Sequence, residues 1–458
     1  MEKAYRNALF ISIALMIGSH YLALFHSWSG WWQLESCAAL VVIFLTPVFA
    51  NTKQICYVVA LVGIGIFVYL FWPGATAGQA FAALRSIVLL VNLIVLVPLL
   101  SLIFVARGHI EALAQAVLRR VQRPSQFYGG VVVLAHLVGS MLLIGSVPIL
   151  FGILRRVQLT VTDHQRRLST AILHGFSLAT LWTPGSALLG MSLAIGTTWS
   201  KLWPLGAGLA LGGLGLAILC QTWPEREKPG DVIKQWGEAI PLTAEHRLVW
   251  EFVFLLVSYL ALVVITEAAT SLRLLDLVPL VAIVFLFAAH AVFRLSPRTV
   301  VQRAAGQLAN ALPAQAGLLS VLLAAGFLGG ALADTGLGAR LFEFYQAALG
   351  YAHLNLLAGI PLLVVLMGFL GFDPLPIISI VITSLQGTAL DVSPVLLAAA
   401  TLVGGTTALF LTPFAAPVLV VSALTGRDPL VTGPGWNWRF GLCFLFGAIA
   451  LMELLHWL

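Results

Sequence analysis

The stretch "LSTAILHGFSLATLWTPGSALLGMSLAIGTT", residues 168–198, is apolar enough to cross a membrane but is interrupted at its centre. As a straight helix it would be about 46 Å long, against about 30 Å for the core of a bilayer. Pro184 lacks a backbone N–H and clashes with the carbonyl four residues earlier, so it ends or kinks a helix. The same Thr-Pro pair returns in "LFLTPFA", residues 409–415. The sequence therefore predicts two membrane helices that are broken near their centres.

The whole chain has the composition of an integral membrane protein. Of its 458 residues, 60% are hydrophobic and 9% are charged, and the mean hydropathy is +1.00. This balance excludes a soluble globular domain. The net charge of +6 comes mostly from residues in predicted loops, so we expect the lipid bilayer, and no nucleic acid, as its partner. The four cysteines lack CxxC spacing, which favours neither a disulfide framework nor a metal site.

Apolar runs predict about eleven transmembrane helices. They lie near 7–25, 34–50, 55–73, 84–106, 168–198, 203–220, 248–267, 275–293, 316–336, 392–424 and 440–457. Two further apolar segments, 128–154 and 354–385, are interrupted by glycine, proline and polar residues. We therefore predict an all-α polytopic fold with about eleven transmembrane helices plus two re-entrant hairpins. Segments 109–121 and 338–349 are predicted to form amphipathic surface helices.

Positive charges fix the orientation, because Lys and Arg prefer cytoplasmic loops. Segment 128–154 has arginines on both sides, which predicts that both of its ends are cytoplasmic. These are Arg107, Arg119, Arg120, Arg123, Arg155, Arg156, Arg166 and Arg167. With a cytoplasmic N-terminus and two hairpins, 20 of the 24 Lys and Arg residues lie inside. If both segments cross, the split is 12 to 12, and if only the second crosses, it is 18 to 6. We expect a multi-pass protein of the cell membrane, and the first run to be a span rather than a cleaved signal peptide.

The two halves of the chain match as an inverted repeat. The two Thr-Pro pairs are 229 residues apart, and the same offset pairs Gly175 with Gly404 and Gly139 with Gly368. In the predicted topology the two broken helices run in opposite directions. The predicted parts are a first half with an extra N-terminal helix over 1–220, a cytoplasmic linker over 221–247 and a second half over 248–458.

Broken helices can build a binding site, because irregular backbone at membrane depth is tolerated only inside protein or along a cavity. Helix N-termini at such breaks face anionic groups, and freed carbonyls can hold a cation. In the alternative interpretation the prolines only adjust packing and the hydroxyls bond back to their own helices. The predicted substrate and ion site comprises Gly139, Ser140, Ser146, Thr180, Thr183, Pro184, Ser186, Asp373, Pro374, Thr406, Thr407, Thr412 and Pro413.

Asp373, in "GFLGFDPLP", is the acid that the second hairpin would carry into the membrane. A carboxyl group there is costly and indicates a role in proton or cation coupling. It is also a good helix cap, since Asp followed by Pro is a common helix start. His136 and His174 are either titrating groups or satisfied packing residues.

In this order of hairpin, broken helix, hairpin and broken helix, the chain resembles the ion transporter superfamily, which includes divalent anion:sodium symporters. The match covers the topology of nearly the whole chain. The sequences that carry it are "LVGSMLLIGSVP", "TLWTPGS", "GFLGFDPLP" and "LFLTPFA". The resemblance implies that the hairpin tips and breaks form the substrate and ion sites. It also implies a scaffold domain that carries a homodimer interface.

We therefore expect a secondary active transporter for a small organic solute, in particular an organic anion, that works by alternating access. Its coupling ion is H⁺ or Na⁺, and we expect no other cofactor. A flippase for a lipid-linked or amphipathic substrate, or a channel, is the alternative, and an intramembrane enzyme is a weaker one. The sequence has no HExxH, GxGD or GxSxG motif, so we expect neither a catalytic residue nor a metal site.

Overall fold

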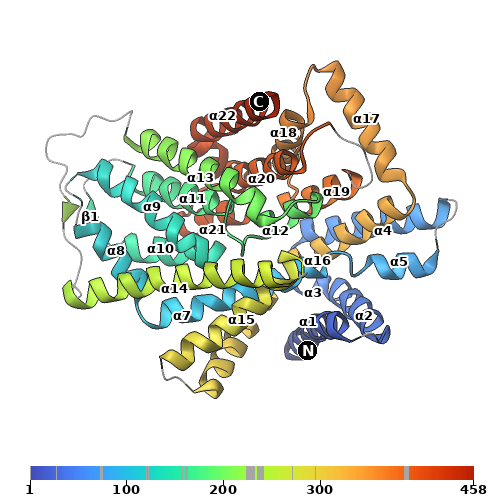
Figure 1. Ribbon diagram of the computed structural model, residues 1–458, viewed down its shortest axis with the longest axis horizontal. Helices are drawn as coiled ribbons and strands as arrows, with labels where there is room; N and C mark the ends of the chain where they lie inside the picture. The colour runs from blue at the N-terminus through green and yellow to red at the C-terminus, as the bar shows by residue number, and fades with distance from the viewer. Residues whose placement is uncertain are drawn as a thin grey trace. The chain divides into compact units, whose positions relative to one another are not determined.

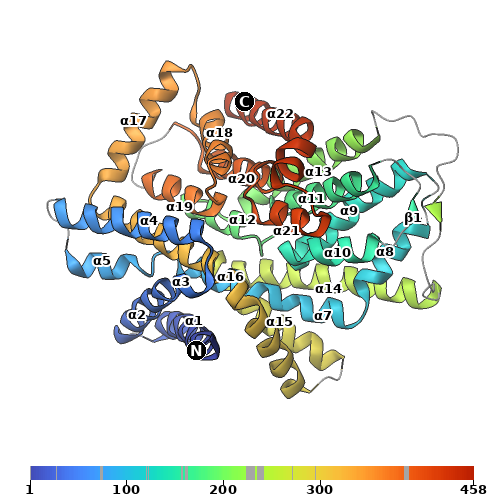
Figure 2. The same cartoon turned by 180° about the vertical axis from the view of Figure 1, so that it is seen from behind.

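A computed structural model gives the fold of the chain, which Figures 1 and 2 show from opposite sides. It describes residues 2–26, 28–72, 76–119, 121, 123–155, 158–159, 163–222, 233–234, 242–270, 272–293, 296–385 and 391–458. These residues are almost entirely helical, which confirms the predicted all-α class. Two two-residue strands, β1 (Gln158–Leu159) and β2 (Ile233–Lys234), pair antiparallel. Most of the predicted linker 221–247 lies outside the described residues.

Eleven helical stretches within the described ranges are long and apolar enough to cross a membrane. Ten of them overlap predicted spans, and the protein is therefore a multi-pass membrane protein. The eleventh stretch, Pro124–Leu154, corresponds to the first predicted hairpin. By length and composition it counts as one span, so its re-entrant path stays a prediction. The predicted span 168–198 is missing from this set because its break divides it into two short helices.

The described residues form two compact units, each built from segments of both predicted halves of the chain. Unit 1 comprises Met1–Leu96, His290–Asn355 and Leu375–Asp391, and unit 2 comprises Val97–Ala289, Leu356–Pro374 and Val392–Leu458. Both units thus take residues from before and after the predicted linker. The inverted repeat is a relation along the sequence, and it stays a prediction beside this division into units.

Unit 1 packs around one long helix. Its helices are α1 (Glu2–Phe25), α2 (Gly30–Phe44), α3 (Thr46–Phe49), α4 (Thr52–Phe71), α5 (Ala77–Ala83), α6 (Val88–Leu96), α16 (Pro297–Asp334), α17 (Leu337–Tyr351) and most of α19 (Pro374–Leu385). The 38-residue α16 packs along α4, where the Tyr69 hydroxyl donates to the Asp334 carboxylate at 2.7 Å. Helix α17 matches the amphipathic segment predicted at 338–349.

Unit 2 contains both breaks. Its first elements are η1 (Val97–Leu100), α7 (Ser101–Ala106), α8 (His109–Arg119), α9 (Pro124–Leu142), η2 (Leu143–Gly145), α10 (Ser146–Leu154), α11 (His164–Ala179), α12 (Ala187–Ser192), η3 (Leu193–Ile195) and α13 (Trp199–Thr222). The rest are α14 (Leu242–Ala269), most of α15 (Leu274–Val292), α18 (Leu356–Phe369), α20 (Pro394–Leu411), α21 (Ala416–Thr425), η4 (Val431–Gly435) and α22 (Trp436–Trp457).

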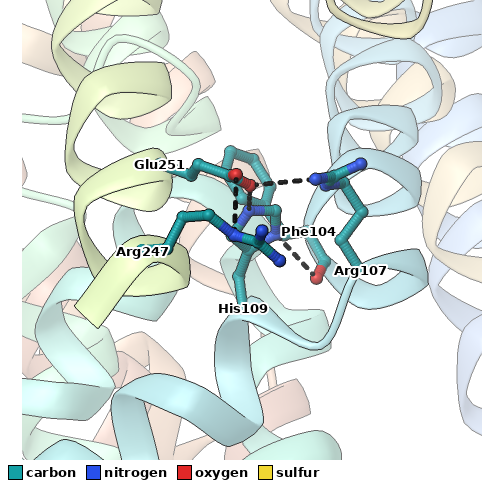
Figure 3. A network of polar contacts seen from close by, with 5 residues as sticks. All are labelled: Phe104, Arg107, His109, Arg247 and Glu251. Atoms are coloured by element: carbon teal, nitrogen blue, oxygen red, sulfur yellow. Dashed lines mark hydrogen bonds and ion pairs between the residues drawn. The ribbon is translucent and has the colours of Figure 1, made fainter. Parts of the chain in front are cut away.

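The amphipathic helix α8 is fastened to α14 by an ionic cluster, shown in Figure 3. The Glu251 carboxylate lies 3.1 Å from Arg107 Nη2, 3.3 Å from His109 Nε2 and 3.7 Å from Arg247 Nε. His109 is fully buried, and its Nδ1 lies 3.3 Å from the carbonyl oxygen of Phe104. Burial lowers the pKa of His109 below its ordinary value, although both hydrogen bonds favour the charged ring.

A second ion pair joins the other end of α8 to the start of α14. Arg119 Nε lies 2.6 Å from Glu245 Oε2, and the Glu245 side chain is almost fully buried. The ionic clamp, defined as these two contacts around Glu251 and Glu245, therefore holds both ends of α8. This agrees with the predicted amphipathic character of 109–121.

Candidate functional site

The first break is a seven-residue interruption between α11 and α12. The end of α11 tightens, because the N–H groups of Thr180 and Leu181 bond to carbonyls three residues earlier, at 3.1 and 3.4 Å. Pro184 follows, and a new helix begins only at Ala187. Ser186 caps that helix, since its hydroxyl oxygen accepts from the Leu189 N–H at 3.4 Å. The segment is thus broken at the predicted place.

The backbone freed by the first break is satisfied by aromatic and imidazole side chains. The Trp182 carbonyl accepts from the indole N–H of Trp199, on α13, at 2.9 Å. The Trp182 indole in turn donates to Nε2 of His136, on α9, at 3.0 Å. His136 Nδ1 lies 3.3 Å from the Gly175 carbonyl. This series of hydrogen bonds holds α9, α11 and α13 around the break. Both ring nitrogens of His136 have a partner in it, so His136 is a satisfied packing residue.

The second break lies between α20 and α21 and spans four residues, 412–415. Both the backbone N–H and the hydroxyl of Thr412 bond to the Ala408 carbonyl, at 3.1 and 2.9 Å. Pro413 follows, and the N–H of Ala415 bonds back to the Thr412 carbonyl at 3.4 Å. Here too the Thr-Pro pair ends one helix and a new helix starts a few residues later.

Paired glycines bring a helix against each broken helix. A Cβ on Gly175 would lie 2.2 Å from the Val132 carbonyl oxygen, so α11 touches the backbone of α9. A Cβ on Gly404 would lie 2.8 Å from Cα of Pro361, so α20 touches the backbone of α18. Gly175 and Gly404 are a pair matched at the 229-residue offset. The two broken helices are therefore packed in equivalent ways.

The second glycine pair, Gly139 and Gly368, lies on the helices that pack against the two broken helices. On α9, a Cβ at Gly139 would lie 3.1 Å from Cα of Phe176 in α11. On α18, a Cβ at Gly368 would lie 2.6 Å from Cγ2 of Thr412, at the second break. Gly139 therefore serves close helix packing.

Hydroxyl groups join the two broken helices directly. Oγ1 of Thr180, at the end of α11, lies 2.9 Å from Oγ1 of Thr406 in α20. Since the Thr180 hydroxyl also donates to the Ser177 carbonyl at 2.6 Å, Thr406 is the donor of the pair. Farther along, Thr401 of α20 donates to the Ser192 hydroxyl of α12 at 2.8 Å. The break junction, defined as these two hydroxyl pairs, contains no charged side chain among its contacts. No local pattern in the sequence predicts the Thr401–Ser192 pair.

Other predicted site hydroxyls divide into two groups. Ser140 and Ser146 bond back to carbonyls three residues earlier, as Thr412 does four residues earlier. In contrast, the hydroxyls of Thr183 and Thr407 are fully buried and have no hydrogen-bond partner among the described residues. A buried hydroxyl without a partner is costly, so these two groups are available to a bound solute or ion.

Asp373 and Pro374 lie at the start of α19. Asp373 is half-buried, and Pro374 is the first residue of the helix. The helices of the second predicted hairpin, α18 and α19, belong to different units. The hairpin and the coupling role of Asp373 therefore stay predictions.

Asn437, at the start of α22, is a site residue that the sequence did not reveal. Its amide NH₂ donates to the carbonyls of Thr432 and Gly433 in η4, a π-helical turn, at 2.8 and 2.7 Å. Its Oδ1 therefore accepts from Nε2 of His174 at 2.8 Å. The His174 ring stacks on Phe440, with the ring centroids 3.8 Å apart. The run "TGPGWN" is the only local signal of this turn.

No family model matches this sequence. No curated protein matches it either. Among solved structures, the YdaH transporter of Alcanivorax borkumensis aligns over 88% of this chain and 97% of its own, with 17% identity and a TM-score of 0.54. MtrF of Neisseria gonorrhoeae, described with a class of antimetabolite efflux pumps, aligns over 88% and 94%, with 16% identity and a TM-score of 0.47. The first similarity shows a shared fold.

Proposed function

We propose that the protein is a secondary active transporter that moves a small organic anion across the cell membrane by alternating access. The observation that carries the proposal is the pair of helices broken at Thr-Pro, which contact each other through Thr180 and Thr406. Discontinuous helices of this kind are the usual way for secondary transporters to build a site at mid-membrane. The shared fold with the YdaH transporter supports the same conclusion.

The proposed site recognises its solute through uncharged groups. Neither segment 168–198 nor segment 392–424 contains Lys, Arg, Asp or Glu. An anion would therefore be held by backbone N–H groups at the breaks and by hydroxyls. The unpartnered hydroxyls of Thr183 and Thr407 are the side chains that we assign to this task.

The architecture supports membership of the ion transporter superfamily as part of this proposal. The equivalent packing of α9 on α11 and of α18 on α20 supports the inverted repeat that such membership requires. In this reading the N-terminus is cytoplasmic, and 128–154 and 354–385 are re-entrant. A homodimer through scaffold helices belongs to the same proposal.

Transport into proteoliposomes tests the function. Purified protein is reconstituted, and uptake of radiolabelled solutes is measured with a proton gradient, a sodium gradient or neither. The panel contains organic anions, such as benzoate and succinate, beside neutral and cationic analogues. We expect gradient-dependent accumulation of at least one anion. If no solute accumulates and the same vesicles scramble a fluorescent lipid, the flippase alternative replaces the transporter.

The coupling ion is tested separately at Asp373. We propose that this acid carries the coupling proton, because a carboxyl group within an apolar membrane segment is costly and indicates a functional role. Asp373→Asn should abolish accumulation driven by a pH gradient and preserve solute exchange between equal pools. The control is Asp428→Asn, since Asp428 is an exposed acid outside both breaks. Wild-type accumulation in Asp373→Asn would leave only the helix-cap role.

A further inference from the structure

A cavity of about 370 Å³ lies among α11, α13 and α22, in unit 2. This volume is within the range of about 300 to 1,000 Å³ that is typical of small-molecule sites. The cavity is lined by the N-terminal half of α11, the C-terminal end of α13 and the first turn of α22. It is therefore at the opposite end of α11 from the first break. In the predicted topology all three of these helix ends are cytoplasmic.

The charge of the cavity lining is positive. Arg166, Arg167 and Arg439 line it, together with one acid, Asp163. Arg167 is held in place, since it donates to the Gln221 carbonyl at 2.6 Å and lies over the ring of Tyr128.

Two of these arginines remain available at the mouth of the cavity. Arg166 and Arg439 are exposed, and neither forms an ion pair among the described residues. Three guanidinium groups against one carboxylate attract anions, and Arg439 keeps its charge unpaired by any acid that the structure describes, although it lies over the ring of Trp438, 5.3 Å from its centroid.

The inner wall of the cavity is apolar and ends at a buried imidazole. Leu216 of α13 and Phe440 of α22 form apolar wall, and His174 also lines the cavity. His174 is 2% exposed, its Nε2 is bonded to Asn437, and its Nδ1 has no partner among the described residues. A polar nitrogen that is buried beside a cavity and lacks a partner marks a place where a ligand atom can bind.

We propose that this cavity binds an amphipathic anion from the cytoplasmic side, with its charged group at Arg166 and Arg439 and its apolar body against Leu216 and Phe440. The anion can be a free organic solute or the headgroup of an anionic lipid, since both present the same chemistry. The site is distinct from the break junction. Its occupancy can be measured without transport, so it does not depend on the proposed function.

Cys220 provides a reporter inside the cavity. It lines the cavity, and replacing Cys37, Cys56 and Cys443 with serine leaves it as the one thiol of the chain. The anionic reagent 2-sulfonatoethyl methanethiosulfonate and the cationic 2-(trimethylammonium)ethyl methanethiosulfonate both convert its thiolate to a mixed disulfide. Each rate is normalised to the rate with 2-mercaptoethanol. The ratio of the two rates then reports the local potential, because thiolate fraction and access affect both reagents alike.

We expect the normalised rate of the anionic reagent to exceed that of the cationic one by about tenfold at low salt, and the excess to shrink at high salt. The Arg166→Gln and Arg439→Gln double variant should bring the ratio close to one. Arg427→Gln, at an exposed arginine outside the cavity lining, is the control and should leave the ratio unchanged. A ratio near one in the parent protein, or a ratio that the double variant leaves unchanged, overturns the proposal.

Protection of Cys220 identifies the source of the anion. Labelling by the uncharged methyl methanethiosulfonate is measured in phosphatidylcholine vesicles, with benzoate or neutral benzamide added. Slower labelling with benzoate alone, lost in the double variant, supports a free organic anion. Slower labelling on adding phosphatidylglycerol, with no further effect of benzoate, supports a lipid headgroup. If neither benzoate nor phosphatidylglycerol slows the labelling of Cys220, the proposal is overturned.

Discussion

The break junction and the ionic clamp hold helices together by opposite chemistry within the same unit. At the junction, α11, α12 and α20 meet through hydroxyls, and the Trp182 carbonyl at the first break accepts from the Trp199 indole. At the clamp, α8 and α14 meet through Glu251, Glu245 and their cationic partners. The junction lies within long apolar segments, where charge is costly, whereas the clamp joins an amphipathic helix to the start of a span. The difference shows that the clamp joins its helices through charged groups, whereas the junction joins its helices through uncharged ones.

The largest expected effect comes from closing the breaks. Pro184→Ala and Pro413→Ala restore a backbone N–H and remove the ring clash, so each helix can continue through its break. We expect each variant to lower the initial rate of transport by about tenfold or more, with little change in the amount of folded protein. The measurement is uptake into proteoliposomes at matched protein content.

Pro279→Ala is the matched control, since Pro279 lies inside the continuous helix α15. It should transport at close to the wild-type rate. If Pro184→Ala and Pro413→Ala also transport at close to the wild-type rate, the prolines of the breaks serve packing only. The contrast between junction and clamp then has no functional meaning.

The next effect concerns the clamp and should appear in stability. Glu251→Gln removes the negative charge that faces Arg107, His109 and Arg247 (Figure 3). Removing one partner of a partly buried ionic cluster leaves the others uncompensated, and should lower the free energy of unfolding by about 1 to 3 kcal/mol. We expect a lower melting temperature in detergent, with a transport rate per folded molecule close to that of the wild type.

Glu343→Gln is the control for the clamp, because Glu343 is exposed on α17. It should leave the melting temperature unchanged. A large loss of transport in Glu251→Gln, at equal folded content, would show that the clamp takes part in the transport cycle.

A smaller effect measures the hydroxyl contact across the junction. Thr180→Val and Thr406→Val, made singly and together, form a double-mutant cycle for the 2.9 Å contact. A neutral hydrogen bond predicts a coupling energy of about 0.5 to 1.5 kcal/mol in unfolding. The pair Thr401→Val and Ser192→Ala, which tests the 2.8 Å contact, should give a similar value. Coupling close to zero in both cycles would mean that these hydroxyls do not hold the broken helices together.

The smallest effect is a pH dependence at the clamp. Burial lowers the pKa of His109 in the folded protein below its ordinary value of about 6.5, so the unfolded chain binds the proton more readily. Stability should therefore be fully present above about pH 6.5 and should decline as the pH falls below it. His109→Gln should reduce this decline, as measured by melting temperatures from about pH 8 to about pH 5.5. An equal or steeper decline in the variant would show that the neighbouring charges outweigh burial.

The sequence determined the features that depend on local chemistry. Composition and run length were enough for the all-α membrane class and for ten of the eleven apolar helical stretches. Both breaks lie at the predicted Thr-Pro pairs, where proline removes a backbone donor, although Pro204, Pro279, Pro313 and Pro361 stay inside continuous helices. The amphipathic segments at 109–121 and 338–349 also became helices α8 and α17. Most of the predicted site residues lie at or beside the two breaks, because they were chosen from the sequence around the two Thr-Pro pairs.

Tertiary structure decided which of those residues meet. Thr180 and Thr406 are 226 residues apart, and no local pattern states that their hydroxyls touch while those of Ser140 and Ser146 bond back to their own turns. The contacts of His174 with Asn437 and of His109 with Glu251 likewise join distant segments. Many polar residues in an apolar chain satisfy the same local rules. Only the packing of α9, α11, α18 and α20, set by close approach at Gly175 and Gly404, selects the partners, because a hydrogen bond forms only where two backbones come close enough.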